Sequence, residues 1–378
     1  MKLTDVCDFQ GGSQPPKDEW SVEKQDGYIR MLQIRDFTQS ERVTPEYIKI
    51  SNSTKICEED DILIARYGAS LGKILTGLAG AYNVAIMRTI PDTSKIKKRY
   101  LYYYLKSDYF QNAILNVGSR AAQAGFNKDD LAKLEISCPS LAKQEEIINV
   151  LYKIESIIEK RKQEIIHLDK LIKARFVELF GDPERNIFSW EEQPLSEHLT
   201  VIGGYAFKSE QFFEEGIPVL RIGNINAGFF RPINLVYWKE DDALSRYKMY
   251  PGDLVMSLTG TVGKDDYGNV CILGTDYDVY YLNQRNAKLE LQDTINKYYL
   301  SMLLKFESVK KKLTGISRGV RQANISNKDI LNLSVPIPPI ELQNEFAAFV
   351  VQVDKSKVVK QNPQSERRIS LWKSIFRS

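Results

Sequence analysis

The sequence has few of the residues from which catalytic centres are commonly built. It contains only 2 histidines and 4 cysteines among 378 residues. His167 and His198 belong to separate segments, and no two cysteines form a CxxC pair. A histidine-based catalytic triad and a zinc or other metal site are therefore not supported. The scattered cysteines are typical of reduced thiols in a cytoplasmic protein.

Long hydrophobic runs and a strong net charge are also lacking. No stretch of about eighteen apolar residues occurs, and the first residues, MKLTDVCDFQGG, lack the apolar core of a signal peptide. We therefore expect a cytoplasmic protein of two or three domains that does not interact with a membrane. With 52 Lys and Arg against 49 Asp and Glu, the overall charge neither requires nor excludes nucleic acid as a partner.

The nucleotide and methyl-transfer motifs that we sought are missing as well. Gly72-Lys73 and Gly263-Lys264 invite comparison with a phosphate-binding P-loop, but both lack its earlier glycine and its Ser or Thr after the lysine. No GxGxxG follows a predicted strand, and no Asn-Pro-Pro-Tyr of amino-methyltransferases occurs. Pro91-Asp92 is not followed by the acid-x-Lys of a metal-dependent nuclease. We therefore expect a binding protein that is not an enzyme and has no cofactor of its own.

What the sequence does contain is one long helical segment, residues 141–180, without Pro or Gly. Its apolar residues alternate at spacings of four and three, which predicts a helix with a heptad seam, and Arg161 and Arg175 fall on that seam. Gly181 and Pro183 end it. At 1.5 Å per residue the helix would be roughly 60 Å long, and its one-sided apolar stripe requires a partner helix. The seam consists of Ile147, Leu151, Ile154, Ile158, Ile165, Leu168, Ile172 and Leu179.

An internal repeat identifies that partner. The segments before and after the long helix share a series of matching residues in the same order, at separations between 188 and 200. The matches include Gly11-Gly12 with Gly203-Gly204, Leu32 with Leu220, Asp61 with Asp253, Asn83 with Asn283, Tyr100 with Tyr299, Asp130 with Asp329, Pro139 with Pro338 and Gln144 with Gln343. Leu171, Lys173 and Phe176 likewise match Leu371, Lys373 and Phe376. We therefore expect residues 341–376 to form the partner helix, with a kink or break at Pro363.

Each half has a mixed pattern of strands and helices. The sequence predicts strands at 28–34, 61–67, 219–225 and 253–258, and one helix per half, at 96–117 and 294–313. Polar loops follow, at 118–128 and 315–328, and then a short strand that ends at Pro139 or at Pro338-Pro339. The run Tyr102-Tyr103-Tyr104 lies on the first helix, where packing is favoured over base stacking.

The polar loops and the Gly-Lys turns carry side chains suited to DNA. Arg forms paired hydrogen bonds with guanine, Asn and Gln do so with adenine, and Lys and Arg bind phosphates. Such residues are also common on any protein surface, but two similar domains held apart by a long helix could contact a duplex at two places. The candidate contacts are Arg35, Arg66, Tyr67, Ser70, Lys73, Arg120, Gln123, Asn127, Arg221, Asn224, Thr259, Thr261, Lys264, Arg318, Arg321, Gln322 and Asn324.

Over essentially its whole length the chain resembles the specificity (S) subunit of type I restriction-modification systems. The resemblance rests on the two Gly-Gly starts, on residues 68–73 and 260–264 around the Gly-Lys pairs, and on the loops that end in Asp130 and Asp329. It also rests on PSLAKQE and PPIELQN at the starts of the long helices and on ARFVELFGDP at 174–183. Pro363 and the one-residue deletion before Gly263 depart from the pattern.

The resemblance implies an α+β fold: two similar mixed α/β target-recognition domains, related by a pseudo-twofold repeat and separated by a pair of long antiparallel helices. The domains would be residues 1–140 (first target-recognition domain), 141–180 (central spacer helix), 181–339 (second target-recognition domain) and 340–378 (C-terminal spacer helix). Each domain would recognise one half of a bipartite DNA site. Because the halves differ strongly outside the shared framework, we expect an asymmetric target. From the length of the long helix, we expect the half-site centres to lie about one to one and a half helical turns apart.

The resemblance also implies partners. Such subunits bind double-stranded DNA and two methyltransferase (M) subunits, and through them restriction (R) subunits; S-adenosylmethionine, ATP and Mg would be bound by those partners. Methylation of adenine would require the base to be flipped out of the duplex. Two alternatives stay open at this stage. One is a non-catalytic coiled-coil adaptor that binds proteins, and the other is the specificity part of a fused methyltransferase-nuclease.

Overall fold

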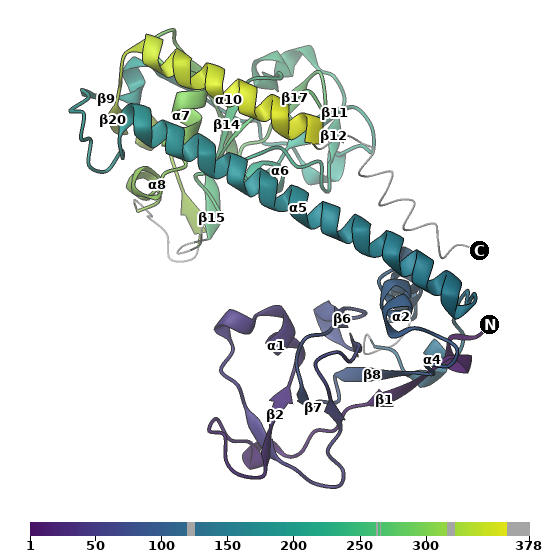
Figure 1. Cartoon of the computed structure of the whole chain (residues 1–378). Helices are drawn as coiled ribbons and strands as arrows, with labels where there is room; N and C mark the ends of the chain where they lie inside the picture. Colours follow the sequence, from purple (N-terminus) through teal and green to yellow (C-terminus); the bar gives the residue numbers. More distant parts are fainter. Residues whose placement is uncertain (119–124, 262–263, 265, 316–321, 361–378) are drawn as a thin grey trace. The chain divides into compact units, whose positions relative to one another are not determined.

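The computed structural model describes residues 1–118, 125–261, 264, 266–315 and 322–360, which form two compact units (Figure 1). The first unit comprises residues 1–162 and the second residues 163–360 of the described chain. Each unit has its own hydrophobic core, and each core includes side chains from one end of the long helix α5. The predicted mixed fold of two globular halves is therefore confirmed.

The helix α5, Leu141–Phe180, has the predicted bounds and is 40 residues long. Its buried side chains differ from the predicted seam. Leu151 and Ile172 are buried as expected, but Ile148, Phe176 and Phe180 are buried in addition, while Ile147 and Leu179 are only partly buried. The reason is that each end of α5 packs against a globular core, so the buried face there is wider than a coiled-coil seam.

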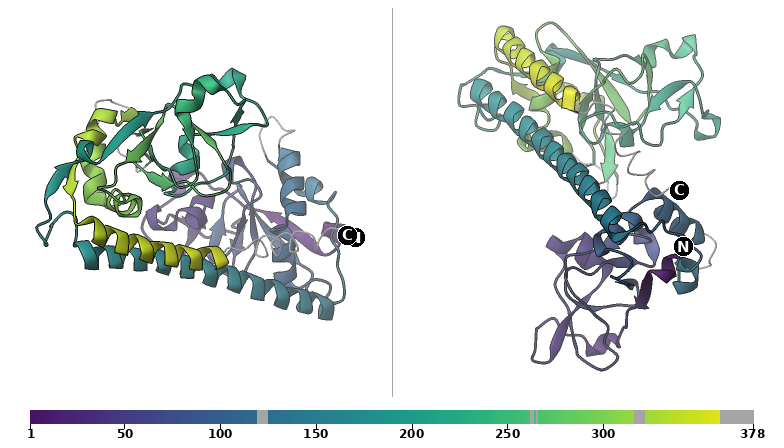
Figure 2. Two further views of the ribbon diagram at one scale, coloured as in Figure 1. Left: turned by 90° about the horizontal axis from the view of Figure 1, so that it is seen from above. Right: turned by 45° about the vertical axis from the view of Figure 1, so that its right-hand side comes forward.

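A second helix, α10 (Ile340–Lys360), lies beside the C-terminal half of α5 (Figure 1, Figure 2). Arg175 donates to Glu345 over 2.6 Å, and Lys357 donates to Asp169 over 2.7 Å, so the two helices run antiparallel. The prediction that the chain supplies its own partner helix is confirmed over residues 341–360. Pro363 and the rest of the predicted helix, residues 361–376, lie outside the described residues.

The two units share one strand order, which confirms the repeat. The first unit has sheets β1-β8-β5-β6 and β3-β2-β7-β4, and the second has the matching sheets β10-β18-β14-β16 and β12-β11-β17-β13. The register matches too: Gly11 pairs with Met87 and Gly203 with Ala287 at the ends of equivalent antiparallel ladders. β2 and β7 pair in parallel, as do β11 and β17. The second unit adds the pairs β15-β19 and β20-β9.

The elements of the first unit begin with β1 (Cys7–Gly11), β2 (Tyr28–Leu32), α1 (Ile34–Thr38), β3 (Tyr47–Lys49), β4 (Ile56–Cys57), β5 (Leu63–Ala65), β6 (Ile74–Leu75), β7 (Gly80–Tyr82) and β8 (Ile86–Pro91). The helices α2 (Lys98–Leu105), α3 (Asp108–Gly118) and α4 (Lys128–Leu131) follow.

The second unit contains β9 (Glu192–Pro194), β10 (Leu199–Gly203), β11 (Ile217–Leu220), α6 (Ile222–Ile225), β12 (Tyr237–Trp238), β13 (Lys248–Met249), β14 (Leu254–Ser257), β15 (Thr259–Thr261), β16 (Val270–Ile272), β17 (Tyr280–Leu282) and β18 (Asn286–Leu291). It continues with α7 (Lys297–Leu303), α8 (Glu307–Thr314), β19 (Gln322–Asn324), α9 (Asn327–Leu331) and β20 (Ser334–Pro336), before α10.

Several predicted elements are shorter or divided. The helices predicted at 96–117 and 294–313 are each two helices, and the first break is at Ser107, whose hydroxyl donates to Tyr104 O over 2.6 Å. The strand predicted at 219–225 ends at Leu220, because the Asn224 side chain accepts from Arg221 N over 3.0 Å and starts α6. Before Pro139 the structure has only an isolated bridge at Glu135, whereas β20 supplies the predicted strand in the second unit.

The tyrosine run of the first unit packs, as expected. Tyr103 and Tyr104 are fully buried on α2. The Tyr103 hydroxyl donates over 2.9 Å to Glu155 of α5, which also accepts from Arg99 over 3.0 Å and from Lys106 over 3.2 Å. These bonds fix α2 to the N-terminal half of α5.

A buried glutamine joins each unit to its long helix. Gln144 of α5 accepts from Lys97 N over 2.8 Å and donates to Pro139 O over 2.8 Å. Its repeat partner Gln343 of α10 accepts from Asn296 N over 2.8 Å and donates to Pro338 O over 2.7 Å. Both glutamines are 0% exposed, so in each unit one buried amide satisfies two backbone groups.

Replacing Gln343 with leucine should therefore destabilise the second unit. The substitution leaves Asn296 N–H and Pro338 C=O without partners, at a cost of roughly 1–3 kcal/mol for each buried group. Urea unfolding measures the loss. The exposed Gln352 of α10 offers a matched control, since Gln352→Leu should change the unfolding free energy by less than about 0.5 kcal/mol. Equal stability of the two variants would contradict the proposed role of the Gln343 hydrogen bonds.

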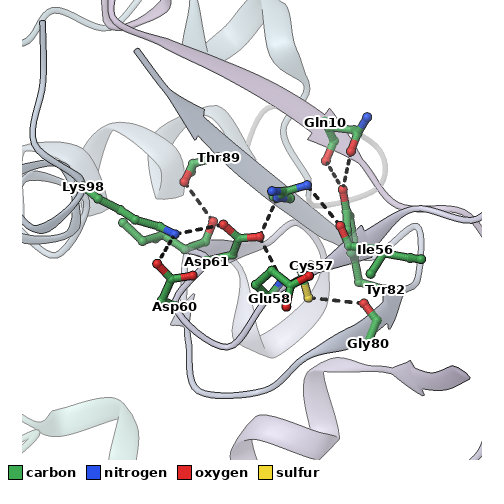
Figure 3. Close-up of polar contacts among 12 residues, drawn as sticks. Gln10, Ile56, Cys57, Glu58, Asp60, Asp61, Gly80, Tyr82, Thr89 and Lys98 are labelled. Carbon is green, nitrogen blue, oxygen red and sulfur yellow. Dashed lines mark hydrogen bonds and ion pairs between the residues drawn. The ribbon is translucent and has the colours of Figure 1, made fainter. Parts of the chain in front are cut away.

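Another repeated interaction surrounds Asp61, whose side chain is almost completely buried (Figure 3). It accepts from Glu58 N over 3.0 Å and Lys98 over 3.0 Å, and it pairs with Arg88 over 2.7 Å. Burial alone would raise the pKa of Asp61, but these hydrogen bonds and the charges of Arg88 and Lys98 outweigh it and hold the pKa below its usual value. Asp253 repeats the arrangement with Tyr250 N and Lys288.

This network predicts a pH-dependent stability. Since the folded Asp61 carboxyl has a lower pKa than the unfolded one, the unfolded chain takes up protons first. The stabilisation is complete above about pH 5, and it is lost as the pH falls through the unfolded pKa near 4 and then through the lower, folded pKa. Asp61→Asn should lower the unfolding free energy by roughly 1.5–3 kcal/mol at pH 7. The difference from the wild type should shrink as the pH falls below about 4. Urea titrations at several pH values measure it, and a difference that does not depend on pH would refute it.

Candidate nucleic-acid interface

In the first unit, predicted contact residues from separate segments come together after β5. Arg66 donates through Nε to Phe126 O over 3.3 Å, and its guanidinium lies 5.0 Å from the Tyr67 ring. Tyr67 forms an isolated antiparallel bridge with Gly125. The start of the Gly-Lys turn therefore lies beside the end of the polar loop. The contact is at Gly125, two residues before Asn127.

The exposed side chains of this surface are Tyr67, Lys73 and Asn127, whereas Arg66 and Ser70 are partly buried. The Asn127 side chain also accepts from Asp130 N over 3.0 Å and so caps α4. Lys73 lies on a closed turn, in which Ala65 N donates to Lys73 O over 2.9 Å. The surface therefore offers one aromatic ring, one ammonium group and an amide.

The second unit builds the equivalent surface as a two-stranded ribbon. β15 pairs with β19 so that Thr259 faces Asn324 and Thr261 faces Gln322. Asn324 and Thr261 are exposed, while Thr259 is almost buried. The Thr261 N–H and hydroxyl both donate to Asp266, over 2.7 and 2.9 Å. Burial raises the pKa of Asp266, but these bonds outweigh that effect and lower it, so a carboxylate lies beside Thr261.

Arg35 and Arg221 occupy related places, at the starts of α1 and α6. Arg35 donates to Glu46 over 2.5 Å, and Glu46 also accepts from Lys17 and Gln33, so much of this positive charge is already compensated. The Arg221 guanidinium donates to Asn234 O.

Asn224 is 1% exposed, and its amide donates to Arg231 O over 3.0 Å and to Ile233 O over 2.9 Å. Because its oxygen also accepts from Arg221 N, every hydrogen-bonding group of this side chain is used internally. We therefore assign Asn224 to the support of the loop and leave it out of the proposed contact set.

Part of the predicted set lies outside the described residues: Arg120, Gln123, Arg318 and Arg321. Of Gln322 the structure describes only the backbone, in β19. Lys264 is described and exposed, and its N–H donates to Thr261 O over 3.0 Å.

A third segment completes each surface, and sequence reasoning missed its importance. We call residues 83–86 and 283–286 the asparagine turns. A β-carbon on Gly12 would lie 2.1 Å from Asn83 O, and one on Gly204 would lie 2.1 Å from Asn283 O. The second glycine of each Gly-Gly start is therefore required by the close approach of the turn.

The turn of the second unit borders an open hollow of ≈ 500 Å³. Its polar lining includes Arg221, Asn234, Gln284 and Arg285, and Phe207 and Phe212 contribute rings. Gln284 and Arg285 are exposed and were not among the predicted contacts. The sequence contains one indication of this segment: Asn83 matches Asn283, whereas the two residues that follow differ between the halves.

Within the described ranges, no group of three or more His, Cys, Asp and Glu side chains could hold a metal ion. Nor is any helix in this part of the chain long and apolar enough to span a membrane.

Comparison with known proteins relates this arrangement to one family. The model of the type I restriction modification DNA specificity domain matches twice, at residues 1–168 and 189–365. A type I restriction enzyme specificity subunit of Methanocaldococcus jannaschii, MjaVIII, is 25% identical over 346 residues, covering 86% of this chain and 79% of the relative. A second one from the same organism, MjaIX, is 24% identical over 92% of this chain and 85% of its own length.

The fold has a solved counterpart. The S subunit of a type I restriction-modification system from M. genitalium superposes with a TM-score of 0.51 at 16% identity, covering 100% of this chain and 95% of that structure. At this identity the likeness concerns the fold alone.

Proposed function

Because the chain belongs to the family of type I restriction modification DNA specificity domains, we propose that it is the DNA sequence-specificity subunit of such a complex. The observation that carries this proposal is the duplicated framework: the same strand order occurs twice, and its exposed turns and loops differ. Each target-recognition domain recognises one half of an asymmetric bipartite site. The subunit itself is not catalytic and has no cofactor.

The cellular test is the pattern of methylated adenines. Deleting the gene should abolish methylation at one bipartite motif, which long-read sequencing detects directly. A methylome that is the same with and without the gene would refute the proposal.

Exchanging the first target-recognition domain should alter only one half-site. A chain in which residues 1–139 come from another family member keeps its own second unit, so the second half-site should persist while the first is replaced. The measurement is again the methylated motif, determined for both parents and the chimera. A change in both half-sites, or in neither, would contradict the assignment of one half-site to each domain. The same chimera tells which half-site belongs to the first unit.

We also infer that the helices dock two methyltransferase subunits, and that restriction subunits join through them. Large apolar side chains are exposed on α5, among them Tyr152 at 60% and Leu171 at 48%, which favours a protein partner there. Those partners supply S-adenosylmethionine, ATP and Mg, and the complex acts in the cytoplasm. Copurification tests this docking. The methyltransferase subunits should copurify with the wild-type chain and should be lost with the double variant Tyr152→Glu, Leu171→Glu.

A protein-binding adaptor would behave differently on DNA. Since phosphate contacts release counterions, DNA binding by the assembled complex should weaken steeply with salt, by several orders of magnitude between about 50 and 200 mM. Binding that is weak and insensitive to salt would favour the adaptor.

A further inference from the structure

The two asparagine turns have the same backbone. In the first unit Ile86 N donates to Asn83 O over 3.0 Å, and Ala85 N donates to the Asn83 side chain over 3.2 Å. The turn is also bonded to the segment after β5, because Arg66 N donates to Ala85 O over 2.8 Å.

The second unit repeats these bonds. Asn286 N donates to Asn283 O over 2.9 Å, and Arg285 N donates to the Asn283 side chain over 3.3 Å. Leu258 N, immediately before β15, donates to Arg285 O over 2.8 Å. Two segments of different sequence therefore present the second and third residues of the turn in the same way.

What they present is chemically different. The first unit has Val84, which is 44% exposed, followed by the partly buried Ala85, whereas the second has the exposed pair Gln284 and Arg285. An apolar pair can contact the methyl group of thymine, but it cannot form hydrogen bonds with base edges. Gln and Arg are the side chains that form paired hydrogen bonds with adenine and guanine in the major groove.

Both turns also lie within the candidate interfaces. Arg66 donates through Nη1 to Val84 O over 3.3 Å, so the first turn adjoins the Arg66 and Tyr67 pair. The second turn lines the ≈ 500 Å³ hollow together with Arg221, whose positive charge suits a phosphate-bearing ligand.

Resting on the proposed function, we propose that the asparagine turns are specificity determinants of the two half-sites. Gln284 and Arg285 form hydrogen bonds with base edges in the half-site of the second unit, and Val84 with Ala85 makes apolar contacts in the other half-site. The hydrogen bonds that hold each turn are made by backbone groups and by the Asn83 or Asn283 side chain. The side chains of the two residues that follow the asparagine can therefore be exchanged without changing the fold.

The test transfers the residues of one turn to the other. The full-length chain with Gln284→Val and Arg285→Ala, expressed with its own partner subunits in cells that lack the wild-type gene, should relax one or two positions in the second half-site. A lost paired contact should reduce the preference at such a position by about 5- to 150-fold. The first half-site and the gap should stay unchanged.

The reciprocal variant, Val84→Gln with Ala85→Arg, should alter the first half-site only. Val84 is exposed and Ala85 is partly buried, and neither side chain takes part in the hydrogen bonds of the turn, so this variant decides the question even if the first one abolishes all methylation. Arg185, exposed just after α5, offers a charge control, because Arg185→Ala should leave the motif unchanged.

The outcomes separate the two proposals. If gene deletion abolishes the methylated motif but both turn variants keep it with the same extent of methylation at every position, the role of the asparagine turns is refuted and the proposed function stands. If deletion leaves the methylome as it was, the proposed function itself fails.

Discussion

Replacing Phe176 with alanine is expected to lower the unfolding free energy of the second unit by about 3–5 kcal/mol. The Phe176 ring is 1% exposed and lies 5.1 Å from the Phe306 ring and 5.4 Å from the rings of Tyr299 and Phe346. It therefore links α5 to α7, to α10 and to the segment before α8. Truncation would remove these contacts together and leave a cavity that three elements of secondary structure would have to close.

Urea unfolding monitored by tyrosine and tryptophan fluorescence measures this loss. The neighbouring Val177 is 37% exposed, so Val177→Ala should change the unfolding free energy by less than about 0.5 kcal/mol. A loss below about 1 kcal/mol for Phe176→Ala would show that the α5 contact is not part of the cooperative core.

Inserting four residues after Gln163 is expected to replace the methylated motif by one with the same half-sites and a longer gap. Four helical residues add about 6 Å and little more than one full turn, so the orientation around the helix axis changes by only about 40°. At 34–36 Å per helical turn of DNA, the added length corresponds to about two base pairs. Methylation of the original motif should be lost.

Long-read detection of methylated adenines measures both the new motif and the loss of the old one. A control without added length, Lys160→Ala with Lys162→Ala, replaces two exposed side chains of the same helical segment and should leave the gap unchanged. An insertion variant that keeps the original gap would show that α5 does not set the spacing.

Much of the framework could be predicted from the sequence, because it rests on long or repeated signals. The absence of Pro and Gly fixed the bounds of α5, and the matched positions identified α10 and the two related sheets. The breaks at Ser107 and Leu220 could not be predicted in the same way. They depend on single side chains, the Ser107 hydroxyl and the Asn224 amide, whose local hydrogen bonds compete with continued helix or strand.

The candidate site was harder to predict, for a related reason. A polar residue that caps a helix and one that contacts DNA look alike in a sequence. The amides of Asn224 and Asn127 predict base contacts, whereas in the structure both amides cap helices, although Asn127 is also exposed. Conversely, no sequence pattern marks Gln284 and Arg285, because only the folded turn places them beside Arg221.

The hydrogen bonds of Gln144 and Gln343 have a consequence for how such a chain can evolve new DNA targets. Gln144 and Gln343 use the same two backbone acceptor and donor positions in the two halves, and neither contact involves a residue of the exposed turns. A recombination event at this boundary would consequently keep these hydrogen bonds wherever the incoming target-recognition domain has the same backbone groups at these two positions. Exchange of such domains, within one gene or between related genes, would thus change the DNA target and preserve the connection between domain and helix.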